Sequence, residues 1–424
     1  MLVDDIIAAK TNNTRSQPGD IVTIPVDYVY LQDGNSPTIA KVFEKEGFEQ
    51  VFDPSRIGVF FDHSVIWPNK EISNRIREAM DFCNRFGLRM FRSGEGISHV
   101  VAIEEGWFAP GAITLGTDSH TCTGGALDCL ALGMGASDVV AAMITGETWL
   151  RVPETVVINV KGLPHPATCA KDVILYALAT FGQEPFLYRS IEWCGPWVRD
   201  LSVDARSTIA SMAVEMGAKC CFLEGAPHSK EIARLEVLGI PPVDELELNI
   251  DGLMPYIARP HLPQNSGPVT ELSETEVNYV FVGSCTNSRF EDISKVARVL
   301  DGRQIAPGVH CLITPGSRRV FEAASEAGHI RTLMNAGAIV TPPGCGACLG
   351  TQGSIPADGD KIVSTMNRNF KGRMGNRDSE IYLASPFIAA LCALEGRVPS
   401  AQQIDEFSTD LVLLETRDSQ EEVT

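Results

Sequence analysis

The sequence is short of positive charge. Its 424 residues include 35 Lys and Arg against 54 Asp and Glu, which gives a formal net charge of 35 - 54 = -19. No dense cluster of Lys and Arg interrupts this balance, and a protein that neutralises nucleic-acid phosphates needs such a basic face. The composition therefore argues against a nucleic-acid partner, and the excess acid predicts a well-solvated surface.

Two kinds of segment are also missing. The first five residues lack the basic and then apolar layout of a signal peptide, and no apolar run approaches the ~18 residues of a membrane span. We therefore expect a cytosolic protein without a membrane partner. In that reducing compartment the 12 cysteines are predicted to be core residues, metal ligands or catalytic thiols, not disulfides.

Short apolar runs alternate with helical spacing along the chain, a pattern typical of α/β layering in two or three domains. Residues 57–61 predict a buried strand. Apolar residues at helical spacing from Ile72 to Cys83 predict a helix that stops near Gly87. Residues 251–277 contain four prolines and predict an interdomain linker.

Polar side chains follow the ends of five predicted strands, where open α/β sheets bind ligands. A purely structural chain would more often place simple turn residues there, so these groups predict one shared site. In chain order they are Asp62 with His63, residues 116–120 (GTDSH), residues 283–289 (GSCTNSR), Cys345 with Cys348, and Asn367-Arg368 with Arg373.

Each group taken alone has a structural explanation. An Asp-His pair is also typical of a capped loop, and Cys345-x-x-Cys348 could be half a zinc site, a redox pair or a coincidence. The sequence has no second CxxC, but Cys285 lies 345 - 285 = 60 residues earlier at another strand end. Three thiolates can hold three irons of a cubane cluster and leave the fourth open, as a Lewis acid.

These motifs resemble those of the aconitase family. The agreement covers nearly the whole chain in the family's order, and it is most specific around the three cysteines. The matching stretches are residues 116–125 (GTDSHTCTGG), 282–292 (VGSCTNSRFED), 342–350 (PPGCGACLG) and 367–373 (NRNFKGR), with weaker matches at 61–63, 94–99 and 212–218.

The resemblance implies an α/β fold with three α/β domains of the aconitase type around a central iron-sulfur cluster. We expect domains at 1–172, 173–270, with the Pro-rich linker at its end, and 271–424. The swivelling fourth domain of the family is expected to be absent from this chain.

The resemblance also implies roles for individual residues. The metal ligands of a 4Fe-4S cluster would be Cys285, Cys345 and Cys348. The acid-base and iron-site residues would be Asp62, His63, His99, Asp118, His120 and Glu215, with His63 as the acid. The substrate contacts would be Gln32, Ser119, Arg289, Asn367, Arg368 and Arg373.

The implied reaction is reversible dehydration of a small hydroxy-dicarboxylate. Arg289 favours the heteromeric, isopropylmalate-type branch of the family, in which a small partner subunit supplies the swivelling domain with its base and a substrate-gripping Arg. Gln32 departs from that branch, and Ser211 stands where the family usually has Asn, so dimethylmalate, citramalate, homoaconitate and aconitate types stay open. A cluster-free RNA-binding protein or an iron or redox sensor is the alternative of another class.

Overall fold

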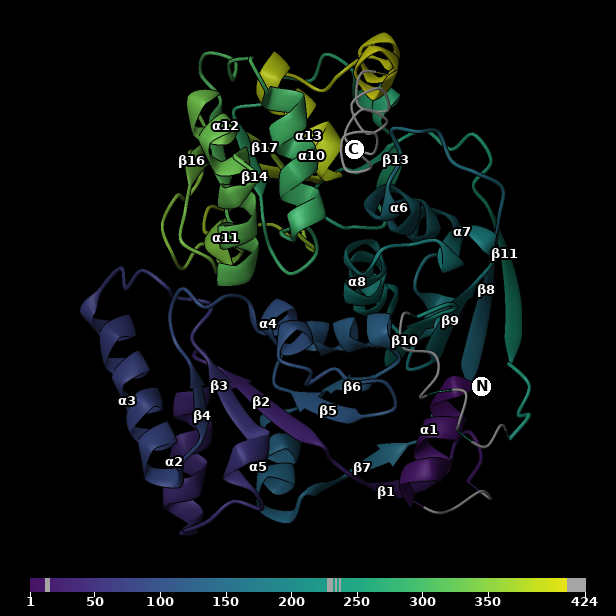
Figure 1. Ribbon diagram of the computed structural model, residues 1–424, viewed down its shortest axis with the longest axis vertical. Coiled ribbons are helices and arrows are strands. Elements are labelled where there is room, and N and C mark those ends of the chain that lie inside the picture. Colours follow the sequence, from purple (N-terminus) through teal and green to yellow (C-terminus); the bar gives the residue numbers. More distant parts are fainter. Residues whose placement is uncertain (12–15, 227–231, 233–234, 236–237, 410–424) are drawn as a thin grey trace, which may run out of the picture. The chain divides into compact units, whose positions relative to one another are not determined.

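The computed structural model describes residues 1–11, 16–226, 232, 235 and 238–409 (Figure 1). The chain forms two compact units. Unit 1 comprises residues 1–161, 181–249 and 343–345, and unit 2 comprises residues 162–180, 250–342 and 346–424. The three-domain boundaries expected from the sequence stay a prediction.

Unit 1 contains a five-stranded sheet in which every neighbouring pair is parallel. Parallel strands need crossover connections, and helices supply most of them. The spatial order is β4-β3-β2-β5-β6. The strands are β2 (Tyr28–Gln32), β3 (Ile57–Phe60), β4 (Arg89–Phe91), β5 (Ile113–Gly116) and β6 (Leu130–Gly133).

Alternate side chains of β2 enter two different cores, as the period of a strand requires. Val29 and Leu31 join one core with residues of α2 (Ser36–Glu46), α3 (Lys70–Phe86) and α5 (Ala136–Thr145). Tyr30 points to the opposite face, where it packs with Phe60 and with residues of α4 (Ser98–Glu104). Helices α2 and α3 pack against each other, as Figure 1 shows. Both faces of this parallel sheet are thus covered.

Unit 1 contains two further sheets. The four-stranded sheet is parallel, in the order β10-β9-β8-β11, and β1 pairs with β7 antiparallel. These strands are β1 (Ile21–Pro25), β7 (Glu147–Arg151), β8 (Thr155–Lys161), β9 (Ser190–Cys194), β10 (Cys220–Leu223) and β11 (Asp244–Asn249). The remaining helices are α1 (Leu2–Thr11), α7 (Pro196–Arg199), α8 (Val203–Met212), η1 (Pro54–Arg56), η2 (Ser119–Leu127), η3 (Glu184–Phe186) and η4 (Ala213–Met216).

Unit 2 is built on a seven-stranded sheet, in the order β13-β12-β18-β17-β14-β15-β16. The last five strands are parallel, whereas β12 is antiparallel to both neighbours. The strands are β12 (Tyr256–Ala258), β13 (Ser266–Pro268), β14 (Tyr279–Val282), β15 (His310–Ile313), β16 (Ile339–Val340), β17 (Lys361–Ser364) and β18 (Glu380–Leu383). The helices are α6 (Ala170–Phe181), α10 (Phe290–Leu300), α11 (Arg318–Glu326), α12 (His329–Asn335), α13 (Pro386–Glu395), η5 (Val269–Leu272) and η6 (Gly346–Leu349).

The α/β class predicted from the sequence is confirmed. The strand expected at 57–61 is β3, and the helix expected to stop near Gly87 is α3, whose C-cap Gly87 has a φ of 67°. The linker prediction for residues 251–277 is wrong as stated, because this stretch contains β12 and β13, which extend the sheet of unit 2. Prolines are tolerated there because β13 is an edge strand.

The 12 cysteines all lie among the described residues, and the structure records no disulfide between them. No helix among the described residues is long and apolar enough to span a bilayer.

Helix η2 carries the 116–125 motif and depends on a close backbone approach. A Cβ atom added to Gly125 would lie 1.6 Å from the carbonyl oxygen of Cys221 in β10. Any side chain at position 125 would therefore push η2 away from β10.

We expect Gly125→Ala to lower the free energy of unfolding by about 3 kcal/mol, at the upper end of the usual overpacking cost, because backbone must move. Urea denaturation measures the change. Gly34→Ala is the control, because a Cβ at Gly34 meets nothing within 4 Å. Equal stability of the two variants would contradict the close approach.

Candidate active site

The five-stranded sheet of unit 1 ends in carboxylates at one edge. Asp33 follows β2, Asp62 follows β3 and Asp118 follows β5 by two residues. The carboxyl ends of parallel strands meet at one edge, and the backbone N–H of Asp33 donates to the Phe60 carbonyl at 2.8 Å. Polar side chains from neighbouring strand ends thus lie close together at this edge, whereas the single site expected from five strand ends stays a prediction.

Asp62 and His63 form a pair at this edge. Asp62 Oδ1 lies 2.6 Å from His63 Nδ1, and Asp62 Oδ2 accepts the backbone N–H of Ser98 at 2.8 Å. Asp33 Oδ1 lies 3.5 Å from the same imidazole nitrogen. Burial lowers the pKa of His63, but the Asp62 carboxylate and the hydrogen bonds to Asp33 and Asp62 outweigh it, so that this pKa lies well above its ordinary value.

Cys345 lies beside this pair. Its backbone N–H donates to the Asp62 carbonyl at 2.9 Å. One ligand atom each from Asp62, His63 and Cys345 lies within 4.8 Å of the others. A thiol predicted to bind metal therefore adjoins the predicted acid.

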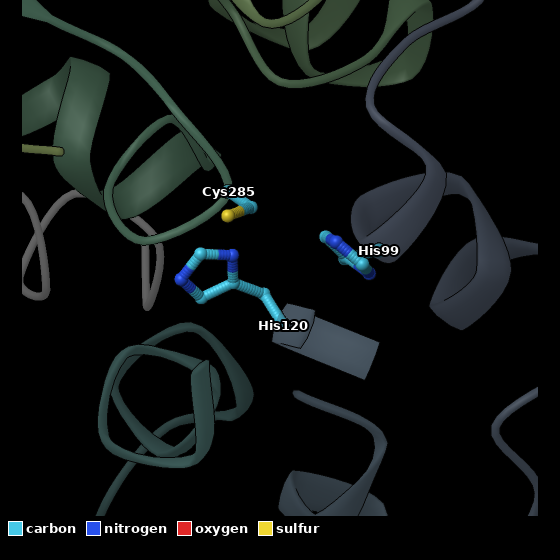
Figure 2. Close-up of side chains that lie close together, drawn as sticks. All are labelled: His99, His120 and Cys285. Carbon is cyan, nitrogen blue, oxygen red and sulfur yellow. The ribbon is translucent and has the colours of Figure 1, made fainter. Parts of the chain in front are cut away.

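A second chain of imidazoles and carboxylates contains His99 and His120, whose rings appear in Figure 2. His99 Nε2 and His120 Nδ1 lie 3.1 and 3.2 Å from Asp118 Oδ1. His120 Nε2 lies 3.1 Å from Glu215 Oε1. Burial raises the pKa of Asp118, but hydrogen bonds from His120 and His99 overcome it and hold that pKa well below its ordinary value. The Asp118 carboxylate is thus a permanent acceptor.

Gln32 and Ser119 lie in the same unit as these groups. The Gln32 amide donates to Ser98 Oγ at 3.2 Å, and Ser119 opens η2 directly after Asp118. Ser98 connects Gln32 to Asp62, because its backbone N–H binds that carboxylate. Gln32 is thus linked to the Asp62–His63 pair by two hydrogen bonds that Ser98 shares.

In unit 2 the loop after β14 carries Cys285. Ser284 has a φ of 73°, in the left-handed region that costs a serine energy, and such strain collects at functional loops. Its Oγ lies 3.9 Å from Cys285 Sγ and 3.6 Å from Cys348 Sγ. One hydroxyl therefore contacts both thiols, which brings two of the three predicted ligands together.

Asn367 and Arg373 contact the same two thiols. Asn367 Oδ1 accepts from Ser284 Oγ at 3.0 Å and from Cys285 Sγ at 3.3 Å. Arg373 donates from Nη2 to Cys348 Sγ at 3.7 Å. Arg368 follows Asn367 directly and is half-buried. The Arg373 guanidinium suits a metal-sulfur group, because it donates to sulfur and the sulfur atoms of such a group accept hydrogen bonds.

Arg289 is a buried side chain that binds the backbone of the loop around Cys285. Its Nη1 donates to the carbonyls of Cys285 at 2.9 Å and Thr286 at 3.2 Å, and the residue is only 3% exposed. The sequence interpretation gave Arg289 to the substrate, and that role stays a prediction. The contacts described here are to backbone.

Sequence reasoning missed Lys171. Its buried ammonium group donates to the carbonyls of Thr365 at 3.0 Å and Met366 at 2.6 Å, the two residues before Asn367. Burial lowers the pKa of Lys171 to about 8. The sequence did offer a sign of this role, because Lys171 and Asp172 are the only charged residues of helix α6, whose other residues are mostly apolar.

Sequence reasoning also missed Tyr30. Its hydroxyl lies 2.8 Å from His99 Nδ1 and 2.9 Å from Thr121 Oγ1. No pattern in the sequence distinguishes a buried tyrosine whose hydroxyl has a functional partner from one that only packs in the core.

Most of the other cysteines are core residues, as predicted. Burial raises the pKa of Cys83, Cys129 and Cys311 to about 12, which keeps these core thiols protonated near neutral pH. Cys122 is buried and donates to the Ala210 carbonyl at 3.2 Å. Cys169 is only partly buried.

The model of the aconitase family (aconitate hydratase) matches residues 4–232 and 256–396. The chain belongs to the aconitase family. Members of this family in general carry an iron-sulfur cluster, and its dehydratases are hydro-lyases.

Three similar curated proteins are named 3-isopropylmalate dehydratase large subunit, or large subunit 1. The protein of Halothermothrix orenii is 38% identical over 419 residues, 95% of this chain and 99% of the relative. A large subunit 1 of Pyrococcus furiosus is 38% identical over 421 residues, 95% and 98% of the two chains. The Aquifex aeolicus protein is 35% identical over 428 residues, 96% and 98%.

Among solved structures, the holo-form of Thermococcus kodakaraensis aconitase X is similar with a TM-score of 0.53. The likeness covers 87% of this chain and 90% of that one at 12% identity, which shows a shared fold only. The aconitase-type α/β fold expected from the sequence is confirmed by this likeness and by the family match.

We expect Lys171→Met to lower the free energy of unfolding by about 1–3 kcal/mol, because two buried carbonyls lose their donor. Chemical denaturation of the full chain at pH 7 measures it. Lys371→Met, at an exposed position of the same unit, is the control and should change stability by less than about 0.5 kcal/mol. A Lys171→Met protein as stable as this control would show that the ammonium group does not support the loop.

Proposed function

We propose that this chain is the cluster-bearing large subunit of a hydro-lyase that interconverts 3-isopropylmalate and 2-isopropylmalate, a step of leucine biosynthesis. The enzyme would remove water from one isomer and add it back to the resulting unsaturated acid to give the other. The observation that carries the proposal is the agreement of relatives with that name at 35–38% identity over 95–96% of this chain. The imidazole and carboxylate pairs of unit 1 supply the proton-handling groups that such a reaction needs.

The proposed cofactor is a 4Fe-4S cluster held by Cys285, Cys345 and Cys348. The donor set fits, since Ser284 Oγ contacts two of these thiols and Asn367 and Arg373 point polar groups at the same sulfurs. When bound, a cluster with one iron free of cysteine supplies a Lewis acid for a substrate hydroxyl.

His63 is the proposed acid that protonates the departing hydroxyl. The Asp62 carboxylate fixes the ring by binding Nδ1 at 2.6 Å, so proton exchange with substrate falls to Nε2. The raised pKa of His63 keeps the ring protonated near neutral pH, which is the form an acid requires.

The second chain of groups is proposed to hold and orient protons. His120 lies between the carboxylates of Asp118 and Glu215, at 3.2 and 3.1 Å, and a protonated ring can donate to both. His99 is bound to Asp118 from the other side. This arrangement fixes two imidazoles with one carboxylate between them.

Substrate carboxylates are proposed to bind the guanidinium groups of Arg368 and Arg373. A guanidinium can give a carboxylate two parallel hydrogen bonds, and its charge stabilises the carbanion-like state formed when the neighbouring C–H loses its proton. The further proposed contacts are Gln32, Ser119, Arg289 and Asn367.

A base must still remove that C–H proton. The groups described above are engaged in acid, orienting or binding roles, and the relatives are named large subunits. We therefore assign the base to a small partner subunit, together with an additional substrate-gripping residue.

We expect the anaerobically reconstituted chain with its cognate small subunit to turn over 3-isopropylmalate, and the chain alone to show no hydration activity. The absorbance of the unsaturated dicarboxylate measures the rate. In a panel with dimethylmalate, citramalate, homoaconitate and aconitate, 3-isopropylmalate should give a kcat/KM at least ~10-fold above the others, the scale that one pocket contact provides.

A higher kcat/KM for another acid of the panel would reassign the substrate within the family. Full activity of the chain alone would contradict the assignment of the base to a partner.

We expect Cys285→Ser to abolish both the cluster absorbance and the activity, because a serine hydroxyl does not replace a thiolate ligand to iron. Iron and acid-labile sulfide contents check the loss directly. Cys194→Ser, at a partly buried cysteine of β9, is the control and should keep both. A Cys285→Ser protein with full iron content would remove Cys285 from the ligand set.

A further inference from the structure

We propose that Tyr30 is a positioning residue that holds the His99 imidazole in one orientation, whether or not the Nδ1 atom of that ring carries a proton. The inference rests on the proposed function, because it assigns a task within the same group of proton-handling residues. It concerns a contact that no sequence motif marks.

Tyr30 is held rigidly. It lies in the middle of β2, is fully buried, and meets Phe60 and Phe108 edge-to-face at ring-centroid distances of 5.5 and 6.2 Å. Such contacts stabilise one ring position and leave the hydroxyl little freedom to move. The hydroxyl therefore stands at a fixed point beside His99.

The two nitrogens of His99 have different partners. Nε2 lies 3.1 Å from Asp118 Oδ1, and Nδ1 lies 2.8 Å from the Tyr30 hydroxyl. The Asp118 carboxylate is ionised and only accepts, so Nε2 carries a proton. The Nδ1 atom can be bare or protonated, and in either state its partner is the Tyr30 hydroxyl.

A phenol hydroxyl suits both states of Nδ1. When Nδ1 is bare, the hydroxyl donates to it. When Nδ1 is protonated, it donates to the Tyr30 oxygen, and the Tyr30 hydroxyl keeps its proton and donates a hydrogen bond to Thr121 Oγ1 at 2.9 Å. Thr121 can accept it because its own proton is donated to the Asp118 carbonyl at 2.6 Å.

The alternative side chains lack this property. A carboxylate or carbonyl at the same point would only accept, and would favour the protonated ring alone. A phenyl ring would leave Nδ1 without a partner in either state, which is costly for a buried polar group. Burial raises the pKa of Tyr30 well above its ordinary value, so the hydroxyl keeps its proton.

The test is Tyr30→Phe in the cluster-loaded chain with its small subunit. The variant keeps the ring that packs on Phe60 and Phe108, so the fold is preserved. We expect kcat to fall about 10- to 100-fold, the scale of a misplaced catalytic group, with KM changed less than about twofold. Tyr28→Phe is the control, since Tyr28 lies on the same strand but stacks on Trp107 at 5.0 Å.

A second measurement does not depend on turnover. In protein with ¹⁵N-labelled histidines, the His99 ring nitrogens, identified by their absence in His99→Gln, should change resonance in Tyr30→Phe and not in Tyr28→Phe. A change confined to His99 supports positioning.

The outcomes separate the two proposals. If the wild type turns over no acid of the panel, the proposed function fails, while the ¹⁵N resonances still test the Tyr30–His99 contact. Wild-type kcat in Tyr30→Phe overturns the inference. A lower kcat with unchanged His99 resonances also overturns it, because the effect would then be a general loss of packing.

Discussion

The Oδ1 atom of Asp118 accepts three hydrogen bonds in unit 1, from the backbone N–H of His120 at 2.7 Å and from ring nitrogens of His99 and His120. The same carboxylate thus caps η2 and joins two imidazoles. Because the cap fixes where the helix begins, it also fixes where His120 points. Glu215 also helps to orient this ring, since its carboxylate binds the other ring nitrogen of His120, Nε2.

Buried cations support the loops in both units by binding backbone carbonyls. Arg206 is fully buried and donates to carbonyls of Ala126, in η2, and of Leu223 and Glu224 at the end of β10. Arg289 and Lys171 do the same for the Cys285 loop and for the residues before Asn367. A charged donor to a carbonyl makes a strong hydrogen bond, and its loss would leave buried acceptors unsatisfied. The loops are therefore fixed by side chains that need not touch a substrate.

The sequence allowed prediction of the parts that depend on local pattern. An apolar run predicted β3, and helical spacing with a terminal glycine predicted α3. The polar groups were predictable because parallel strands end at one edge, which the contacts of Asp33, Asp62 and Asp118 follow. Tyr30 and Lys171 were not predictable in this way. Their roles depend on what lies opposite a buried side chain, and that is decided by packing between segments far apart in the chain.

The prolines of residues 251–277 led to the prediction of a linker, but they have a different role at the edge of a sheet. In this stretch β13 forms one edge of the seven-stranded sheet. Pro268 ends that strand and has no N–H to offer a further strand, and the opposite edge strand, β16, is only two residues long. An exposed sheet edge invites pairing with another copy of the chain. Pro268, one of the residues that suggested a linker, thus limits further pairing at the β13 edge, and the shortness of β16 limits it at the other edge.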